Sequence, residues 1–316
     1  KNLNILNEPS AIPFNIDFSR NQETYDRQGF DKLILDAPAE IDSTLAQALQ
    51  NVLDEAIIEY NIKGLSAAIS APNCDIWKGA SGISHDTVGI TTDMLFGVGS
   101  ITKTFMATII MQLYEADSLN LNDSIYRWLP HFDNIDSTIT VKQLLNMTSG
   151  IFNFTNHPAF VDSAFVSGSR IWTPEEIIET FVLSPSFPPG TNWEYCNTNY
   201  ILLGMIIEEI TGNDVVTELH NRFTIPLELN STFLFPDEGY EGVRSHVWIS
   251  QGSTVTDITE LVDTTAFSAV WTAGCILSTA ENLVLWSKGL NEGGILNDTT
   301  LALMKVPTPY SGGYYG

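Results

Sequence analysis

The chain has 316 residues, a formal net charge of −24 and 44% hydrophobic residues. This length fits one large domain or two moderate ones, and the apolar content is sufficient for a hydrophobic core. Binding to nucleic acid or to an anionic membrane surface requires clustered lysine and arginine, whereas this chain has 14 basic and 38 acidic residues. The composition therefore argues against both kinds of partner, and the strong like charge predicts a monomer.

The sequence contains no apolar run of about 18 residues, so it predicts no membrane span. Its first residues, KNLNILNEPS, lack the apolar segment of a signal peptide, as the mature form of a secreted protein also would. Three cysteines lie far apart and show no C-x-x-C spacing: Cys74, Cys196 and Cys275. One disulfide or three buried thiols fit this spacing, and we favour buried thiols.

The first third of the chain predicts a helix, two strands and a second helix. Residues 1–40 show no sustained apolar period and are interpreted as an N-terminal extension. Helical spacing over 41–62, with Asp42 or Ser43 as N-cap, predicts the first helix. Residues 64–83 predict two strands joined by a Pro-Asn turn. A helix over 101–116 should follow, with its first turn beginning at the preceding serine.

The rest of the chain is predicted to be mainly helical. Prolines interrupt residues 118–190, which indicates several short helices. Residues 197–212 are apolar on nearly every face and end in Gly212, so they predict a buried central helix. Residues 272–294 predict a short strand or turn and then a helix capped by Ser278 or Thr279.

The stretch GVGSITKTF, residues 97–105, allows three interpretations. A phosphate-binding loop needs a glycine directly before the lysine, and Thr102 occupies that position. An ordinary helix start is the commonest meaning of Ser-x-x-Lys, with Ser100 as the cap and Lys103 exposed on the first turn. However, a lysine at the positive end of the helix dipole is unfavourable unless another group interacts with it.

In the third interpretation, Ser100 is the nucleophile of a hydrolase. Positions i and i+3 share one face of a helix, so the Lys103 amine can reach the Ser100 hydroxyl. A desolvated amine with a lowered pKa can accept the serine proton, and the Ser100 N–H at the helix start can stabilise an oxyanion.

A second motif supports the nucleophile interpretation. The segment PPGTNWEYCNTNY contains Tyr195-Cys-Asn197, a Y-x-N triplet directly before the predicted buried helix. Tyr195 can take part in proton transfer, and Asn197 can contact a substrate amide or Lys103. The alternative is a core tyrosine followed by an asparagine helix cap.

Together these stretches resemble the serine β-lactamase-like family that includes class C β-lactamases and D-alanyl-D-alanine carboxypeptidases (peptidase family S12). Further similar stretches are ITVKQLLNMTSGI, PLELNST and TAGCILSTAENLVLWSKGL. The resemblance implies an α/β fold of the α+β type, with an antiparallel sheet flanked by helices. It assigns 41–99 and 277–316 to an α/β domain and 100–276 to a mainly helical domain, with the active site at their junction.

The sequence departs from the family pattern at three positions. Met147 replaces the usual histidine of L-L-x-H-T-S-G, a position that we interpret as structural. Cys196 is the middle residue of Y-x-N, where a small residue should be tolerated. The third motif, K-T-G or H-T-G, is absent, so we expect the chain to be roughly 60 or more residues short of a complete member.

The resemblance implies a serine hydrolase that forms an acyl-enzyme on Ser100, with Lys103 and Tyr195 sharing the acid and base roles and Asn197 binding substrate. A D-alanyl-D-alanine carboxypeptidase or related penicillin-recognising hydrolase ranks first, and an esterase of the same family second. A non-catalytic binding or assembly module is the alternative from another class. Expected substrates are a small peptide, a β-lactam or an ester, and the expected location is periplasmic or extracellular.

Neither a cofactor nor a metal ion is expected. The five histidines show no metal-ligand spacing, and the sequence has no G-x-S-x-G elbow of an α/β-hydrolase.

Overall fold

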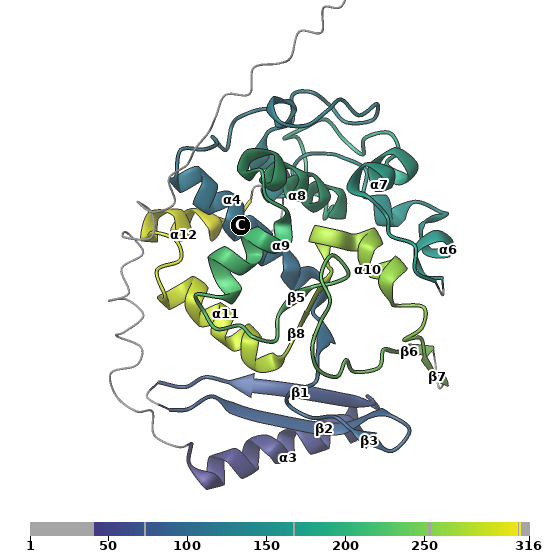
Figure 1. Ribbon diagram of the computed structural model, residues 1–316, viewed down its shortest axis with the longest axis vertical. Coiled ribbons are helices and arrows are strands. Elements are labelled where there is room, and N and C mark those ends of the chain that lie inside the picture. The colour runs from purple at the N-terminus through teal and green to yellow at the C-terminus, as the bar shows by residue number, and fades with distance from the viewer. Residues whose placement is uncertain (1–40, 73, 167, 252–253, 309, 311–316) are drawn as a thin grey trace, which may run out of the picture. The chain divides into compact units, whose positions relative to one another are not determined.

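A computed structural model of the protein describes residues 41–72, 74–166, 168–251, 254–308 and 310. Figure 1 shows the described elements as helices and strands. The extension predicted over 1–40 and the last residues of the chain, 311–316, lie outside the described part.

The first sheet is antiparallel, with strand order β1-β2-β3. Its strands are β1 (Gly64–Ile69), β2 (Trp77–His85) and β3 (Val88–Gly89). Helix α3 (Ser43–Glu59) packs on β2, and α11 (Ala280–Glu292) packs on β1 (Figure 1). The predicted strands and first helix are confirmed, and the Asp42 carboxylate caps that helix by accepting from the N–H groups of Thr44 and Leu45.

A second antiparallel sheet connects distant parts of the chain. It has the order β4-β8-β5, with β4 at Phe96–Gly97, β8 at Ile276–Ser278 and β5 at Phe233–Leu234. Strands β6 (Trp248–Gln251) and β7 (Thr254–Asp257) form a separate ribbon. In the β4–β8 pair, Phe96 lies opposite Ser278 and Gly97 opposite Leu277. This pair brings the segment before Ser100 against the segment after Ala273.

Helices make up most of the chain between β4 and β8. They begin with the 3₁₀ turn η1 (Gly99–Ile101) and α4 (Thr102–Glu115), which confirms the second predicted helix. The others are η2 (Ile125–Arg127), α5 (Val141–Leu145), η3 (Phe154–Asn156), α6 (Phe160–Ala164), α7 (Pro174–Phe181), α8 (Asn197–Thr211), α9 (Val215–Leu219), η4 (His220–Thr224), α10 (Thr264–Val270) and η5 (Trp271–Ala273). After β8 come α11, which Thr279 caps as predicted, and α12 (Asp298–Met304).

Helix α8 is the buried central helix that the sequence predicts. Its residues from Thr198 to Ile207 are all buried, and it packs against α4, α5, α7, α9 and η5. Gly212 ends it in the left-handed conformation, with φ 69°. Because α8 begins at Asn197, the core fixes the position of the Y-x-N motif.

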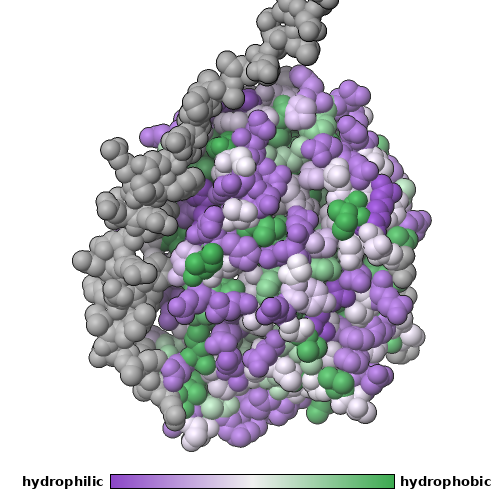
Figure 2. All heavy atoms as spheres, viewed as in Figure 1, coloured by the Kyte–Doolittle hydropathy of each residue, from purple (hydrophilic) through white to green (hydrophobic). Residues whose placement is uncertain are grey.

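The surface in Figure 2 is mainly hydrophilic, with apolar residues scattered among polar ones on the face shown. None of the helices that the structure describes is both long and apolar enough to span a bilayer.

The cysteines are free thiols, and the expectation of three buried thiols holds for two of them. Cys196 and Cys275 are buried, whereas Cys74 is half-buried. The reason is that Cys74 lies in the connection between β1 and β2, at the rim of the first sheet, and the other two lie beside α8 and β8 in the core.

Candidate active site

Ser100 lies in a tight turn between β4 and α4. Gly99 precedes it with φ 54°, a left-handed conformation that favours glycine. The N–H of Val98 donates to the Ile276 carbonyl at 2.9 Å and so ties the turn to β8. Ser100 is exposed, and its hydroxyl does not cap α4, as the ordinary helix interpretation required. Instead, two side chains of the sequence motifs contact this hydroxyl.

Lys103 is the first of these side chains. Its Nζ lies 3.2 Å from Ser100 Oγ, and the residue is only 3% exposed. Burial disfavours the charged ammonium and lowers the pKa of Lys103 to about 7. The i, i+3 spacing therefore places an amine that is partly neutral at neutral pH beside the hydroxyl.

Two further contacts orient the Lys103 amine. Its N–H groups donate to Asn197 Oδ1 at 2.8 Å and to the Ala273 carbonyl at 2.6 Å. Both oxygens can only accept hydrogen bonds. In the neutral amine, the two N–H groups are therefore occupied, and the remaining lone pair faces Ser100.

Tyr195 contacts the other side of the same hydroxyl. Its OH donates to Ser100 Oγ at 2.6 Å. Half-burial of Tyr195 raises the pKa of the phenol, so the group is a neutral donor at physiological pH. The Lys103 Nζ lies 5.0 Å from the centre of the Tyr195 ring. Ser100, Lys103, Tyr195 and Asn197 thus form one cluster.

One loop, residues 149–155, holds the start of α8 in place. The Asn197 N–H donates to Asn153 Oδ1 at 3.0 Å, and the Asn197 Nδ2 donates to Thr155 Oγ1 at 3.1 Å. At the next residue of α8, Thr198 Oγ1 donates to the Phe152 carbonyl at 2.7 Å. The loop therefore positions the Y-x-N motif from outside the helix.

Met147, which replaces the histidine of the family pattern, contacts the Y-x-N motif. Met147 is fully buried, and its Sδ accepts from the Cys196 N–H at 3.4 Å. Cys196 itself is buried and donates from Sγ to the Ile151 carbonyl at 3.3 Å. Both departures from the family pattern thus have a packing role, as the sequence interpretation of Met147 expects.

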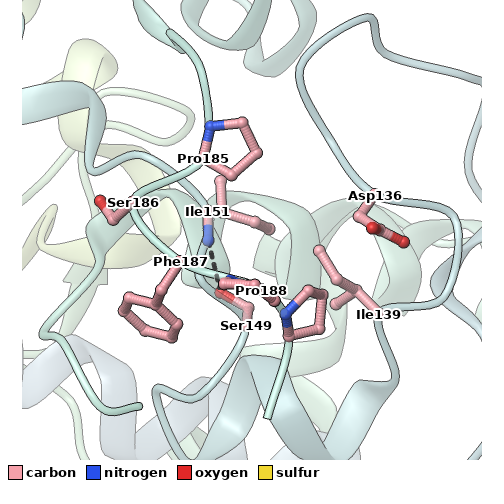
Figure 3. A pocket seen from close by; sticks show the side chains of 9 residues that line it. Asp136, Ile139, Ser149, Ile151, Pro185, Ser186, Phe187 and Pro188 are labelled. Atoms are coloured by element: carbon pink, nitrogen blue, oxygen red, sulfur yellow. Dashed lines mark hydrogen bonds between the residues drawn. The ribbon is translucent and has the colours of Figure 1, made fainter. Parts of the chain in front are cut away.

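A cavity of about 380 Å³ adjoins the same loop (Figure 3). It is lined by Ser149, Ile151, Asp136, Ile139, Phe187 and the neighbouring prolines, and by none of the four predicted site residues. Ser149 accepts from the Ile151 N–H at 3.2 Å and donates to Asn199 Oδ1 at 2.7 Å. These contacts give Ser149 a structural role in the loop.

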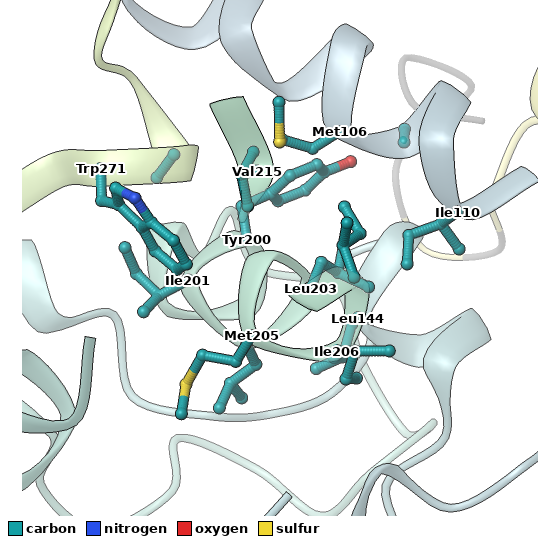
Figure 4. Close-up of a cluster of buried hydrophobic side chains, with 14 of the residues drawn as sticks. Met106, Ile110, Leu144, Tyr200, Ile201, Leu203, Met205, Ile206, Val215 and Trp271 are labelled. Atoms are coloured by element: carbon teal, nitrogen blue, oxygen red, sulfur yellow. The ribbon is translucent and has the colours of Figure 1, made fainter. Parts of the chain in front are cut away.

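The carbonyl that holds Lys103 comes from the turn η5. Trp271 begins this turn with φ 31°, an unfavourable conformation for a bulky residue, and its indole N–H donates to Asp237 Oδ2 at 2.6 Å. Thr272 Oγ1 donates to the Tyr200 carbonyl of α8 at 2.8 Å. Figure 4 shows Trp271 beside Ile201 in the apolar cluster around α8. The core thus anchors both ends of the site, Asn197 and η5.

Sequence reasoning missed three contributors: the Ala273 carbonyl, Asn153 and Thr155. The carbonyl belongs to the backbone and has no residue signature. Asn153 and Thr155 lie 44 and 42 positions before Asn197, and nothing in their spacing indicates contact.

Comparison with known families agrees with this geometry. A family model described as Beta-lactamase matches residues 41–314. The chain belongs to the Beta-lactamase family. This is a family of serine hydrolases, and the family and fold expected from the sequence are confirmed.

Two curated relatives of this Beta-lactamase family protein are penicillin-binding proteins. Penicillin-binding protein 4 of Amycolatopsis lactamdurans is 29% identical over 267 residues, which are 80% of this chain and 66% of that protein. Putative penicillin-binding protein PbpX of Bacillus subtilis (strain 168) is 30% identical over 224 residues, 70% of this chain and 52% of that protein. The chain therefore spans between half and two thirds of the length of these two relatives.

Two solved structures are similar over more of their length. D-amino acid amidase from Ochrobactrum anthropi SV3 has a TM-score of 0.74 and 29% identity, covering 84% of this chain and 75% of that one. D-stereospecific amidohydrolase from Streptomyces sp. has a TM-score of 0.73 and 31% identity, covering 87% and 82%. Both support the mixed helix and antiparallel-sheet fold of this Beta-lactamase family member.

Proposed function

We propose that the protein is a serine hydrolase that works through an acyl-enzyme on Ser100. The observation that carries this proposal is the Lys103 amine, buried 3.2 Å from the Ser100 hydroxyl, with a pKa lowered to about 7. An amine that ionises near the working pH is well suited to general base catalysis. Its two acceptor-only partners direct its lone pair at Ser100, which favours Lys103 over Tyr195 as the first base.

The proposed acylation proceeds in two steps. In the first, the Ser100 proton moves to neutral Lys103 while Oγ bonds to the substrate carbonyl carbon, and the Ser100 N–H at the helix start stabilises the oxyanion. In the second, the oxyanion collapses, the carbon–nitrogen bond breaks, and the leaving nitrogen takes the Tyr195 hydroxyl proton. The Lys103 ammonium then returns a proton to the phenolate, which restores both groups. Water subsequently releases the acyl group from Ser100.

We infer that the substrate is an amide whose acyl group has the D configuration. A D-alanyl-D-alanine carboxypeptidase or related penicillin-recognising hydrolase is the first candidate, supported by the penicillin-binding relatives. A D-amino acid amidase is the second, supported by two solved structures that are 29% and 31% identical. In both reactions, Asn197 is proposed to contact the substrate amide with the second N–H of its Nδ2.

The remaining sequence interpretations stay predictions. These are the periplasmic or extracellular location, the monomeric state, the absence of a metal or cofactor, and the role of a third motif.

Three substrates distinguish the candidates: a D-alanyl-D-alanine peptide, D-phenylalanine amide and p-nitrophenyl butyrate. The full-length protein is compared with Ser100→Ala, and L-phenylalanine amide serves as the stereochemical control. Release of D-alanine supports the first candidate and release of ammonia from the D-amide alone supports the second. Turnover of the ester alone would promote the esterase. Equal rates for wild type and Ser100→Ala on all substrates would contradict the proposed function.

A further inference from the structure

The turn η5, which contacts Lys103 through a backbone carbonyl, is attached to the segment that follows β5. Strands β5 and β8 are antiparallel, with Leu234 opposite Ile276. The chain therefore leaves β5 at the same edge of the sheet at which it enters β8. Asp237 follows β5 closely, and Trp271 begins η5 just before β8. At this edge, the Trp271 indole N–H donates to Asp237 Oδ2 at 2.6 Å.

Trp271 has a backbone conformation that a bulky residue avoids, with φ 31° and ψ −129°. Such a conformation persists only where the surrounding contacts hold it. Packing holds the ring, because a Cβ added to Gly204 of α8 would lie 2.7 Å from Trp271 Cζ3. The hydrogen bond to Asp237 holds the indole N–H. An indole N–H can only donate and a carboxylate oxygen can only accept, so this contact has one possible direction.

The backbone of Trp271 also closes the turn around Ala273. Its carbonyl accepts from the Gly274 N–H at 2.8 Å and from the Cys275 N–H at 2.9 Å. The Ala273 carbonyl between these contacts accepts from Lys103 Nζ at 2.6 Å. A rotation of the Trp271 backbone toward a favourable conformation would therefore move the Ala273 carbonyl relative to Lys103.

Glu238 fixes the segment that carries Asp237. Its Oε1 accepts from the Leu234 N–H at 2.7 Å, and its own N–H donates to the Leu234 carbonyl at 3.1 Å. Its Oε2 lies 2.7 Å from His220 Nε2 of η4. Asp237 itself is exposed, so a substitution there removes the acceptor of the indole N–H without opening the core.

We propose that Asp237 is a positioning residue, which through Trp271 holds the Ala273 carbonyl on Lys103. This inference rests on the proposed function, because its importance comes from the role of Lys103 as base. The hydrogen bond to the indole carries the effect, and the charge of Asp237 is not needed for it. An uncharged side chain that accepts from the same N–H should therefore replace the carboxylate.

Loss of the Ala273 carbonyl would affect Lys103 in two ways. A carbonyl oxygen stabilises the ammonium, so its loss would lower the pKa of Lys103 further. In the neutral amine, the released N–H would be free to donate to Ser100 Oγ, and the lone pair would no longer be directed at this hydroxyl. Titratable side chains around the amine are Tyr195, Tyr200 and Cys196. A change at Asp237 removes none of them.

The test compares Asp237→Leu, which has nearly the same shape but no acceptor, with Asp237→Asn, which keeps an oxygen that can accept from the indole. Asp54→Leu is the matched control, since Asp54 of α3 is also exposed and accepts from Ser81 Oγ at 2.7 Å. Two quantities are measured for each folded variant. One is the acylation rate, measured with fluorescent penicillin and with D-phenylalanine amide. The other is the titration midpoint of Lys103, followed by NMR of protein labelled with carbon-13 at lysine Cε. The Lys103 signal is assigned by its loss in Lys103→Met.

For Asp237→Leu we expect acylation to slow by about tenfold, since a misplacement of about 1 Å can slow catalysis by up to about a hundredfold. The Lys103 midpoint should move to lower pH. Asp237→Asn should keep both quantities near the wild-type values, and Asp54→Leu should change neither. Trp271→Phe, which lacks the indole N–H, should reproduce both effects. Adding Asp237→Leu to Trp271→Phe should change them no further.

The inference is overturned if Asp237→Leu keeps the wild-type rate and midpoint, or if Asp237→Asn loses as much as Asp237→Leu. A slower rate with an unchanged midpoint would show a merely structural role and would also overturn it. Additive effects in the double variant would do the same, because Asp237 would then act by a route other than Trp271. Asp237→Ala replaces the leucine variant if that variant does not fold.

The midpoint of Lys103 does not depend on turnover and can be measured in the Ser100→Ala background. Failure of the wild type to acylate would therefore reject the proposed function. The Lys103 midpoint would still decide the role of Asp237.

Discussion

At the scale of residues, Lys103 determines the chemistry that the site can perform. A lysine normally remains protonated up to about pH 10 and so cannot act as a base at neutral pH. Burial of Lys103 lowers its pKa to about 7. The Ala273 and Asn197 oxygens hold the Lys103 amine in the same orientation when it loses its proton. We therefore propose that Lys103 activates Ser100 without a histidine.

This environment predicts the pH dependence of acylation. Below about pH 7, protonation of Lys103 removes the base, so the acylation rate should fall by about tenfold per pH unit. Stopped-flow acylation between about pH 5 and about pH 9 measures the profile. In Lys103→Arg, the acylation rate should not increase with pH over this range, because arginine stays charged. A wild-type rate that does not change between pH 5 and 8 would contradict Lys103 as the base.

The same burial makes stability depend on pH. The pKa of Lys103 is lower in the folded protein than in the unfolded chain, so between pH 7 and pH 10 the unfolded state binds more protons. Folding stability should therefore rise with pH across this window relative to Lys103→Met, which lacks the titration. The unfolding free energies of the wild type and of Lys103→Met are measured by urea denaturation at pH 7 and pH 9. Between these two pH values, their difference should shift by about 2 kcal/mol in favour of the wild type. A constant difference would show that the lysine is not held in a desolvated site.

At the scale of elements, the site depends on the close approach of α8 and η5. Gly204 of α8 faces this turn: an added Cβ would lie 2.6 Å from Thr272 Oγ1 and 2.7 Å from Trp271 Cζ3. Glycine is therefore required for the two segments to pack. The contact matters for function because η5 carries the Ala273 carbonyl to Lys103.

Gly204→Ala should separate α8 from η5. We expect a loss of about 1–3 kcal/mol of unfolding free energy, as overpacked cores show, together with slower acylation. Gly239→Ala is the control, since no atom lies within 4 Å of a Cβ there. Urea denaturation and acylation kinetics of both variants measure the effect. Equal stability of the two variants would show that η5 can move without cost.

The elements differ in how far the sequence could predict them. Helices α4 and α8 are long and periodic, so their own residues predict them. The Ser100–Lys103 and Tyr195–Asn197 spacings can likewise be seen within a short stretch of sequence. The two-residue strands β4 and β5 are too short to show alternation. Helix α3 was predicted from its apolar spacing, yet none of its residues is buried, and Ile58 is 82% exposed. Thr155 could not be found, because its contact with Asn197 depends on the path of a loop.

At the scale of the whole molecule, the net charge of −24 distinguishes between the two substrate candidates. A protein of high net charge attracts substrates of opposite charge, and salt screens this attraction over about 10 Å at 0.1 M. D-phenylalanine amide carries a free ammonium, whereas penicillins and D-alanyl-D-alanine peptides carry a carboxylate. The negative field of the protein therefore favours binding of D-phenylalanine amide and disfavours binding of penicillins and D-alanyl-D-alanine peptides.

Salt should consequently have opposite effects on the two kinds of substrate. Added sodium chloride should lower kcat/KM for D-phenylalanine amide and raise the acylation rate with penicillin, each by about twofold or more. A neutral ester such as p-nitrophenyl butyrate controls for general effects of salt. If all three substrates respond alike, the surface charge has no part in substrate selection.

The most direct test of the account is the mass of the protein after reaction with penicillin. The wild-type protein should gain the mass of one penicillin, and peptide mapping should place the adduct on Ser100. Ser100→Ala should gain nothing. An adduct on another residue, or an adduct that persists in Ser100→Ala, would contradict the assignment of Ser100 as the nucleophile.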